Sequence, residues 1–483
     1  MDHHLSPGTT ADLAIIGSGG AAFAAAIRAR EDGLRVVMVE RGVLGGTCVN
    51  TGCVPSKALL AAAEARHTAG DGVGRFAGIS ATVSPVDMPA LVEGTQRLVA
   101  QLRAEKYQDI AAAHGWEILP GHARFAGAPE DPVLTVTAQD GTVTAVEAQH
   151  HLIATGSRPT LPPVPGLEDV TPLTSTSAMQ QETLPGSLLV LGGGPVALEQ
   201  AQLFARLGSQ VTLLVRSRLV SREEPEASHA LTEALREDGI HVVLQAAVDR
   251  LRADPVTSSV TAEVRTPDGG QVVSAERLLV AVGRTPNTED LGLEQVGVRT
   301  GQRGEVLVTE QLVSSNPRIW AAGDVTGGRE FVYVAAAQGA LMVANAFHSA
   351  GRALDDVHLP SVTFTSPAIA RAGMTRAMAE AADIDHESRT VPMSQVPRAR
   401  VQRDTRGLIT VVAQRQSGRI LGVSAVARDA GELAASAVHL LDAERTVEQV
   451  AGAWAPYLTM AEGLKLTCQA FSTDVTTLSC CAV

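Results

Sequence analysis

Cys48 and Cys53 are the residues whose type and spacing point most directly to chemistry. They lie in the segment Gly-Gly-Thr-Cys-Val-Asn-Thr-Gly-Cys-Val-Pro-Ser-Lys, residues 45–57. Four residues separate the two cysteines, which differs from the two-residue spacing of a zinc ribbon. A predicted helix start follows Cys53, and Lys57 adds positive charge; both features lower a thiol pKa. We predict a redox-active dithiol, with a pair of structural thiols as the alternative.

A second cysteine pair, Cys480 and Cys481, ends the chain two residues before its C-terminus. Adjacent thiols on a short tail do not pack easily into a core, but they suit capture of a soft cation, because thiolates select soft metals. Hg(II) accepts two thiolates and moves between thiol pairs by ligand exchange. We therefore predict that this pair collects such a metal and delivers it to Cys48 and Cys53, so that all four cysteines are metal ligands.

Two glycine-rich turns predict dinucleotide-binding units. In the first, a buried strand at residues 13–16 is followed by Gly17, Gly19 and Ala22, an alanine-rich helix and a second strand that ends at Glu40. Gly17 permits the tight turn, Gly19 lets the backbone approach a pyrophosphate, and Ala22 keeps helix and strand close. The helix N-terminus binds phosphates, and Glu40 would accept hydrogen bonds from ribose hydroxyls.

The second turn repeats this pattern with Gly192, Gly194 and Ala197. Its following strand ends at Arg216, where an NAD site would favour an acid, and Arg222 is close behind. Guanidinium groups bind phosphate dianions through a planar fork. The pair therefore predicts a 2′-phosphate and favours NADPH over NADH, whereas the plainer alternative is a solvated basic loop.

Composition limits the class of protein. The chain has 483 residues, 45% of them hydrophobic, and a net charge of −13. That charge argues against nucleic acid as a partner. No signal peptide and no apolar run long enough for membrane insertion is visible, so we expect a cytoplasmic protein. The five cysteines are an odd number, which does not suit a disulfide scaffold.

At this point the chain resembles the FAD-dependent pyridine nucleotide-disulfide oxidoreductases. The residue 45–57 motif carries the resemblance, together with the segments 121–123, 154–156, 283–287 and 321–324. The resemblance implies an α/β fold with two Rossmann-like dinucleotide-binding domains and a C-terminal α+β dimerisation domain. The expected boundaries are 1–160 and 284–355 for the FAD domain, 161–283 for the NADPH domain and 356–483 for the dimerisation domain with its tail.

The same resemblance assigns roles to individual residues. Cys53 would face the flavin, Cys48 would be the interchange thiol, and Lys57 and Glu199 would form an ion pair near the flavin N5. Val332 would begin a helix near the pyrimidine end of the flavin. The other residues implied in cofactor binding are Gly42, Gly46, Thr47, Ala123, Thr155, Gly156, Gly283 and Asp324.

The C-terminal segment departs from the family in one position. The family places a proton-donating histidine in a His-Pro-Thr-x-x-Glu segment, where this chain keeps Thr459 and Glu462 but has Tyr457. A phenol, with a pKa of about 10, is a poor proton donor at neutral pH. The tyrosine and the terminal Cys-Cys both resemble family members that reduce Hg(II).

The expected reaction is therefore NADPH-dependent reduction of Hg(II), supplied as thiol complexes, to Hg(0). Tyr457 would act as an electrostatic or hydrogen-bonding group, with Glu462 in the same site. In the family, the tail and this tyrosine serve the neighbouring subunit, which implies a homodimer.

Several alternatives stay open. One alternative function is that of a low-molecular-weight disulfide reductase related to dihydrolipoamide dehydrogenase. Another is that of a metal-sequestering protein without turnover. The last four residues also match a C-a-a-X prenylation box. Two further interpretations of the terminal cysteines are a redox tail of the large thioredoxin reductase type and a tail without function.

Overall fold

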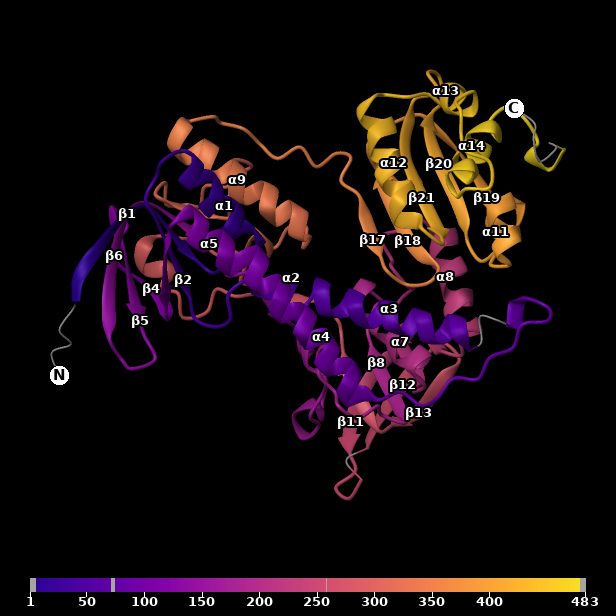
Figure 1. Ribbon diagram of the computed structural model, residues 1–483, viewed down its shortest axis with the longest axis horizontal. Coiled ribbons are helices and arrows are strands. Elements are labelled where there is room, and N and C mark those ends of the chain that lie inside the picture. The colour runs from indigo at the N-terminus through magenta and orange to yellow at the C-terminus, as the bar shows by residue number, and fades with distance from the viewer. Residues whose placement is uncertain (1–5, 71–73, 258, 478–483) are drawn as a thin grey trace. The chain divides into compact units, whose positions relative to one another are not determined.

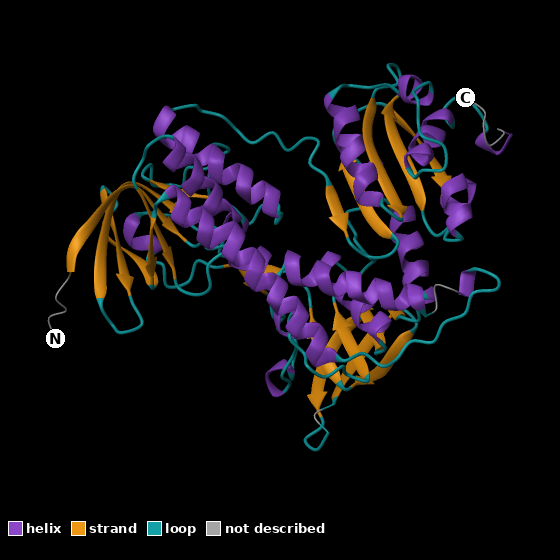
Figure 2. Ribbon diagram, in the orientation of Figure 1, coloured by secondary structure: helices purple, strands orange, loops and turns teal. Residues whose placement is uncertain are grey.

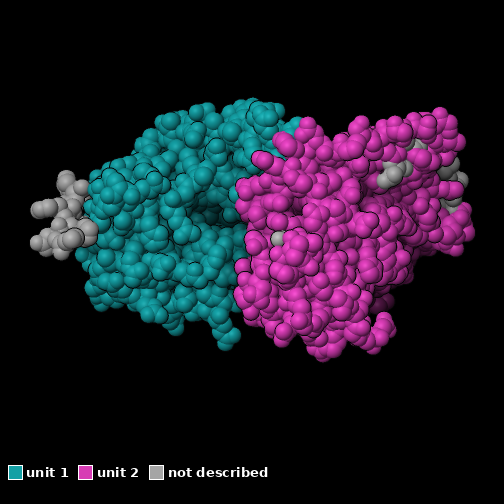
Figure 3. All heavy atoms as spheres, turned by 90° about the horizontal axis from the view of Figure 1, so that it is seen from below, with its two compact units in different colours: residues 1–58, 90–160, 283–354 teal, residues 59–89, 161–282, 355–483 magenta. Residues whose placement is uncertain are grey.

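A computed structural model describes residues 6–70, 74–257 and 259–477, with side chains from residue 9 onward. The chain divides into two compact units (Figure 3). Unit 1 comprises residues 1–58, 90–160 and 283–354, and unit 2 comprises residues 59–89, 161–282 and 355–483. Cys480 and Cys481 lie outside the described residues.

Unit 1 is built on a seven-stranded sheet in the order β3-β2-β1-β6-β5-β4, with β16 paired to β6. β1, β2, β3, β6 and β16 pair in parallel, and β4, β5 and β6 form an antiparallel meander. Leu13, Ala14 and Ile15 of β1 are fully buried, as expected for a parallel strand covered on both faces. The strands are β1 (Ser6–Ile16), β2 (Val36–Glu40), β3 (Glu117–Pro120), β4 (His122–Ala128), β5 (Asp131–Thr137), β6 (Val143–Ile153) and β16 (Ile319–Ala321).

Helices α1 (Gly20–Glu31) and α9 (Val332–His348) pack side by side in unit 1 (Figure 1). Both are rich in alanine, and small side chains let two helices approach closely. A separate two-stranded antiparallel sheet pairs β7 (Ser157–Pro159) with β15 (Arg284–Pro286). The other helices that lie in or enter unit 1 are α2 (Gly46–Thr51), α3 (Cys53–Ala69), α4 (Met88–Arg103), a π-helical turn at Ala104–Gln108 and α5 (Asp109–His114).

Unit 2 contains a four-stranded parallel sheet in the order β10-β9-β8-β14 and a three-stranded antiparallel sheet, β11-β12-β13. The parallel sheet carries the second glycine-rich turn, between β8 and α7. The elements are β8 (Ser187–Leu191), β9 (Gln210–Val215), β10 (His241–Leu244), β11 (Ala247–Ala253), β12 (Val260–Thr266), β13 (Gly269–Ala275), β14 (Arg277–Val280), α6 (Ser175–Ala178), α7 (Pro195–Leu207) and α8 (Pro225–Glu237).

The C-terminal part of unit 2 is a five-stranded antiparallel sheet in the order β17-β18-β21-β20-β19. β21 is buried along its whole length, so both faces of the sheet are covered, one of them by α12 (Figure 2). The elements are β17 (Ser361–Thr363), β18 (Ala368–Gly373), β19 (His386–Pro392), β20 (Leu408–Gln414), β21 (Ile420–Ala427), α10 (Arg376–Ala381), α11 (Pro397–Gln402), α12 (Ala430–Asp442), α13 (Val447–Ala451) and α14 (Ala461–Gln469).

Both sequence-predicted βαβ patterns form as expected, and α9 begins at Val332 as the resemblance implied. Within the described ranges, none of the helices combines the length and the hydropathy that crossing a bilayer would need.

Candidate functional site

The two cysteines of the predicted dithiol lie on consecutive helices of unit 1. Cys48 is in α2, and Cys53 is the first residue of α3, with Gly52 between the helices. Neither cysteine forms a disulfide in the described part of the chain; Cys53 is exposed and Cys48 is half-buried. A helix N-terminus carries free N–H groups and a positive dipole end. Cys53 therefore sits where a thiolate is stabilised.

The thiols of Cys48 and Cys53 interact, and this interaction is the largest cause of a shift in the pKa of Cys48. A hydrogen bond with Cys53, followed by burial and the charge of Cys53, raises the pKa of Cys48 well above its ordinary value. Lys57, one helical turn after Cys53, opposes this and lowers the pKa of Cys48. Cys48 thus keeps its proton to a higher pH than an isolated thiol does, because its pKa is raised.

Tyr107 is a residue of this site that the sequence analysis missed. It lies on the π-helical turn Ala104–Gln108, and its ring packs edge-on against Phe23 at a centroid distance of 4.7 Å. Burial, and then the charges of Cys48 and Cys53, raise the pKa of its phenol. A π-turn often marks a functional position, but a pattern of residue types does not reveal one.

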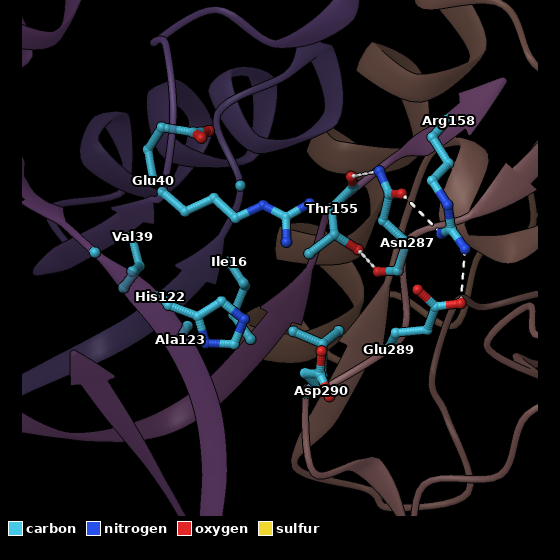
Figure 4. A pocket seen from close by; sticks show the side chains of 14 residues that line it. Ile16, Val39, Glu40, His122, Ala123, Thr155, Arg158, Asn287, Glu289 and Asp290 are labelled. Atoms are coloured by element: carbon cyan, nitrogen blue, oxygen red, sulfur yellow. Dashed lines mark hydrogen bonds and ion pairs between the residues drawn. The ribbon is translucent and has the colours of Figure 1, made fainter. Parts of the chain in front are cut away.

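A cavity of about 150 Å³ opens at the carboxyl end of the parallel strands of unit 1 (Figure 4). Four sequence-predicted residues line it, namely Gly17, Glu40, Ala123 and Thr155. Gly17 has φ +103°, and a Cβ there would stand 2.4 Å from the carbonyl oxygen of Ala154. Only glycine lets β1 turn so close to the end of β6.

Glu40 connects the loops around this cavity through hydrogen bonds. Its Oε1 accepts a hydrogen bond from Gly42 N at 2.7 Å, and its Oε2 accepts one from Ser18 Oγ at 2.5 Å. Ser18 Oγ in turn accepts from Gly45 N at 3.1 Å. A carboxylate has acceptor sites left after two such bonds, so Glu40 still has the capacity to bind ribose hydroxyls. Gly19 is the N-cap of α1, whose Ala22 is fully buried, and Gly46 and Thr47 begin α2.

Asn287 completes the opposite wall of the cavity. Thr155 Oγ1 donates to its carbonyl oxygen at 2.6 Å, and Asn287 Nδ2 donates to Thr155 O at 3.0 Å. Its backbone N–H donates to Gly156 O at 2.9 Å. Arg158 donates to the Asn287 side chain and to Glu289, as Figure 4 shows. The sequence motif at residues 283–287 contained Asn287, but not its pairing with Thr155.

Asp324 and Val332 lie on the α9 side of unit 1. Asp324 Oδ2 accepts from Ser157 Oγ at 2.7 Å and lies 3.9 Å from Arg284 Nε. The preceding residue, Gly283, has φ +134° and is exposed. The Val332 side chain is exposed at the N-terminus of α9, and its free backbone N–H groups make this helix end an anion-stabilising position.

The second glycine-rich turn has the geometry of the first. Gly192 has φ +137°, and a Cβ there would stand 2.3 Å from Ala281 O. Gly194 is the N-cap of α7, and Ala197 is fully buried. Both Arg216 and Arg222 are exposed beyond the end of β9.

Arg218 adds a third cation to this loop. One of its nitrogens, Nη1, is buried and lacks a hydrogen-bond partner in the described part of the chain, while Nη2 donates to Ser221 O at 2.7 Å. Leaving a buried donor unsatisfied is costly.

Glu199 is buried on α7, and its Oε1 accepts from Phe364 N at 2.9 Å. Lys57 belongs to unit 1 and Glu199 to unit 2, so their ion pair stays a prediction.

Tyr457 lies in the loop between α13 and α14, and Glu462 lies in the first turn of α14. Tyr457 is half-exposed. Burial raises the pKa of Glu462, while a backbone hydrogen bond from Leu458 lowers it, and the net shift is upward. Cys468 is in the core, as expected of a structural cysteine, and burial raises its pKa to about 12.

Comparison with known proteins agrees with this fold. Residues 11–339 match the pyridine nucleotide-disulphide oxidoreductase family, and residues 359–468 match the dimerisation domain of that family. The chain belongs to the pyridine nucleotide-disulphide oxidoreductase family.

Among curated proteins, the chain is similar to the mercuric reductase of Streptomyces lividans, at 56% identity over 98% of both chains. It is also similar to the mercuric reductase of Staphylococcus aureus, at 43% identity over 98% of this chain and 84% of that one. Among solved structures, it resembles a Cu(II) complex of the HOCl-induced flavoprotein disulfide reductase RclA from Escherichia coli. That match has a TM-score of 0.84 and 27% identity, covering 96% of this chain and 99% of the other.

Proposed function

We propose that this protein is a mercuric reductase, which reduces Hg(II) to Hg(0) with electrons from NADPH. The overall reaction is Hg(II) + NADPH → Hg(0) + NADP⁺ + H⁺, in which the hydride of NADPH supplies both electrons. One observation carries the proposal. The family's dithiol, Cys48 and Cys53, is present, while Tyr457 occupies the position of the family's proton-donating histidine. The names of the relatives that are 56% and 43% identical support it.

The residues around the unit 1 cavity fit FAD. The glycine turn at Gly17 and Gly19 and the α1 N-terminus suit a pyrophosphate, and Glu40 suits a ribose. When bound, FAD supplies the two-electron transfer between nucleotide and dithiol. The remaining residues proposed to hold it are Ala22, Gly42, Gly46, Thr47, Lys57, Ala123, Thr155, Gly156, Gly283, Asp324 and Val332.

The second turn fits NADPH. Gly192, Gly194 and Ala197 would admit the pyrophosphate at the α7 N-terminus. Arg216 and Arg222 would bind the 2′-phosphate, with the unsatisfied Nη1 of Arg218 as a further donor. Charge-assisted hydrogen bonds to phosphate are stronger than those between neutral groups.

The dithiol is the proposed reduction site. Two thiolates complete the preferred coordination of Hg(II), and softness selects this metal over harder cations. The helix N-terminus at Cys53 and the charge of Lys57 favour the thiolate form that binding requires. Hg(II) bound by Cys48 and Cys53 accepts two electrons and leaves as Hg(0), because the neutral atom is held weakly by thiolates.

The proposed assembly is a cytoplasmic homodimer. Each tail would carry Hg(II) on Cys480 and Cys481 to the dithiol of the partner, where Tyr457 and Glu462 of the donating subunit would complete the site. We further propose an FAD domain of residues 1–160 and 284–355, an NADPH domain of residues 161–283 and a dimerisation domain of residues 356–483. The match of residues 359–468 to a dimerisation domain supports the last of these.

An NADPH-oxidation assay tests the function directly. Purified protein is given Hg(II) in excess thiol and, separately, lipoamide and glutathione disulfide. We expect oxidation that depends on Hg(II). Brisk turnover of the disulfides without Hg(II)-dependent oxidation would instead identify a disulfide reductase, the function named for the solved relative from Escherichia coli.

A double substitution, Cys480→Ala with Cys481→Ala, tests the tail. It should lose turnover of thiol-complexed Hg(II) while keeping the absorbance that arises between Cys53 and the flavin. Cys468→Ala is the matched control, because Cys468 is buried in the core of unit 2. Unchanged turnover in the double variant would remove the role proposed for the tail.

A further inference from the structure

Trp454 is the most exposed large hydrophobic side chain among the described residues, with 95% of its surface accessible. The other tryptophans, Trp116 and Trp320, are 6% and 7% exposed. An indole is mostly buried in folded proteins, since it carries a large apolar surface. A fully exposed tryptophan therefore indicates a surface that another molecule covers.

The loop that presents Trp454 is held in shape at both ends. At its start, Gly452 N donates to Glu448 O at 3.0 Å, and Ala453 N donates to Val450 O at 3.1 Å. At its end, Thr459 Oγ1 donates to Pro456 O at 2.8 Å. Such a preorganised loop loses little conformational entropy on docking.

The chain segment that carries Trp454 is uncharged. Residues 449–461 contain no acidic, basic or histidine side chain, although the whole chain has a net charge of −13. Two copies with that charge repel each other, so a contact between them is favoured where charged side chains are lacking. The centre of a protein interface is depleted of charge and enriched in tryptophan and tyrosine.

We propose that Trp454 is an anchor of the interface between two copies of this chain, and that its docking positions Tyr457 for the partner's dithiol. Trp454 lies within the segment that matches a dimerisation domain and three residues before Tyr457. In a two-fold dimer each loop docks on the other copy, so two tryptophans are buried. The inference rests on the homodimer of the proposed function, and Trp454 is a positioning residue for it.

Substitution of Trp454 by glutamate tests the anchor. Val256→Glu is the matched control, because Val256 is also on a turn of unit 2 and is 89% exposed. In a sedimentation dilution series, we expect the dimer dissociation constant of Trp454→Glu to rise at least about 30-fold, the effect of one interface hot spot. Val256→Glu should leave it unchanged. Equal dissociation constants for the two variants would overturn the proposal.

Fluorescence gives a second measurement that does not depend on a disruptive variant. The emission difference between the unsubstituted protein and Trp454→Phe reports Trp454 alone. On dilution from dimer to monomer this emission should move to longer wavelength and become more accessible to acrylamide. Emission typical of a solvent-exposed indole in the dimer would also overturn the proposal.

Neither measurement uses Hg(II). The results therefore test the role of Trp454 in the dimer independently of the proposed reaction. Loss of dimerisation in Trp454→Glu without Hg(II) turnover in the unsubstituted protein would keep the anchor and remove the reaction. If the unsubstituted protein turns over Hg(II) and Trp454→Glu does not weaken the dimer, the proposed reaction is kept and the anchor is removed.

Discussion

At the scale of single residues, the dithiol shows how two identical side chains acquire different chemistry. Cys53 begins a helix, and Cys48 is half-buried beside it. Their interaction raises the pKa of Cys48, so removal of a proton from one thiol makes removal of the second harder.

Replacing Cys53 by serine should lower the pKa of Cys48, because the interaction with Cys53 is the largest cause of its rise. Replacing Lys57 by glutamine should raise that pKa further, since the charge of Lys57 lowers it. The measurement is the pH dependence of alkylation at Cys48, located by mass spectrometry of the fragmented peptide. Shifts in the same direction for the two variants would contradict this account of the site.

At the scale of elements, β6 carries a buried base in the middle of the unit 1 sheet. His151 is fully buried, its ring lies edge-on to Phe125 at 5.5 Å, and neither ring nitrogen has a hydrogen-bond partner in the described residues. Burial, followed by the charges of Arg318 and His150, lowers the pKa of His151 to about 4. The strand is therefore stable with His151 neutral.

This burial predicts a pH dependence of stability. Below its ordinary pKa of 6.5 His151 binds a proton in the unfolded chain, whereas in the folded chain it does so only below about 4. Its contribution is therefore fully present above pH 6.5 and lost as the pH falls to about 4, a change of about 3 kcal/mol.

Urea unfolding at pH 7 and pH 4.5 measures the effect. His151→Leu should reduce the difference between the two free energies of unfolding, whereas His229→Leu, at an exposed position of α8, should not. A pH dependence that is the same in both variants would show that His151 is not its source.

At the scale of the whole molecule, buried ion pairs connect distant parts of unit 2. Asp238, at the C-terminal cap of α8, lies 2.8 Å from Arg206 of α7 and 3.0 Å from Arg406, which precedes β20. Arg206 also donates to Ser366 O at 3.0 Å and pairs with Glu64 of α3. The network therefore joins the nucleotide-binding sheet of unit 2 to its five-stranded sheet.

Asp238→Asn should cost about 2–3 kcal/mol of stability, because it removes charge-assisted hydrogen bonds from two buried guanidinium groups and leaves Arg206 with Glu64 and Arg406 with Asp404. The control is Asp249→Asn, which removes the exposed pair with Arg265 and should cost at most about 1 kcal/mol. Chemical denaturation compares the two. Similar losses would mean that the buried network adds no more than a surface pair.

Some features of this protein were predictable because short stretches of chain determine them. The turns at Gly17 and Gly192 need a backbone conformation that other residues rarely adopt, so the glycines reveal them. The strand and helix that flank each turn follow from hydrophobic periodicity. The Cys48–Cys53 spacing likewise places two thiols on two consecutive helices, and the sequence by itself determined the family.

Other features depend on residues that are far apart in the chain. Tyr107 reaches the dithiol only because α1, α2 and the π-turn pack together, and Asn287 meets Thr155 only where β7 and β15 pair as antiparallel strands. His151 and its neighbour His150 look alike in the sequence, yet strand pairing buries one fully and the other in part. Tertiary structure alone decided these environments, because the burial and charge around a side chain are set by contacts that the local sequence does not contain.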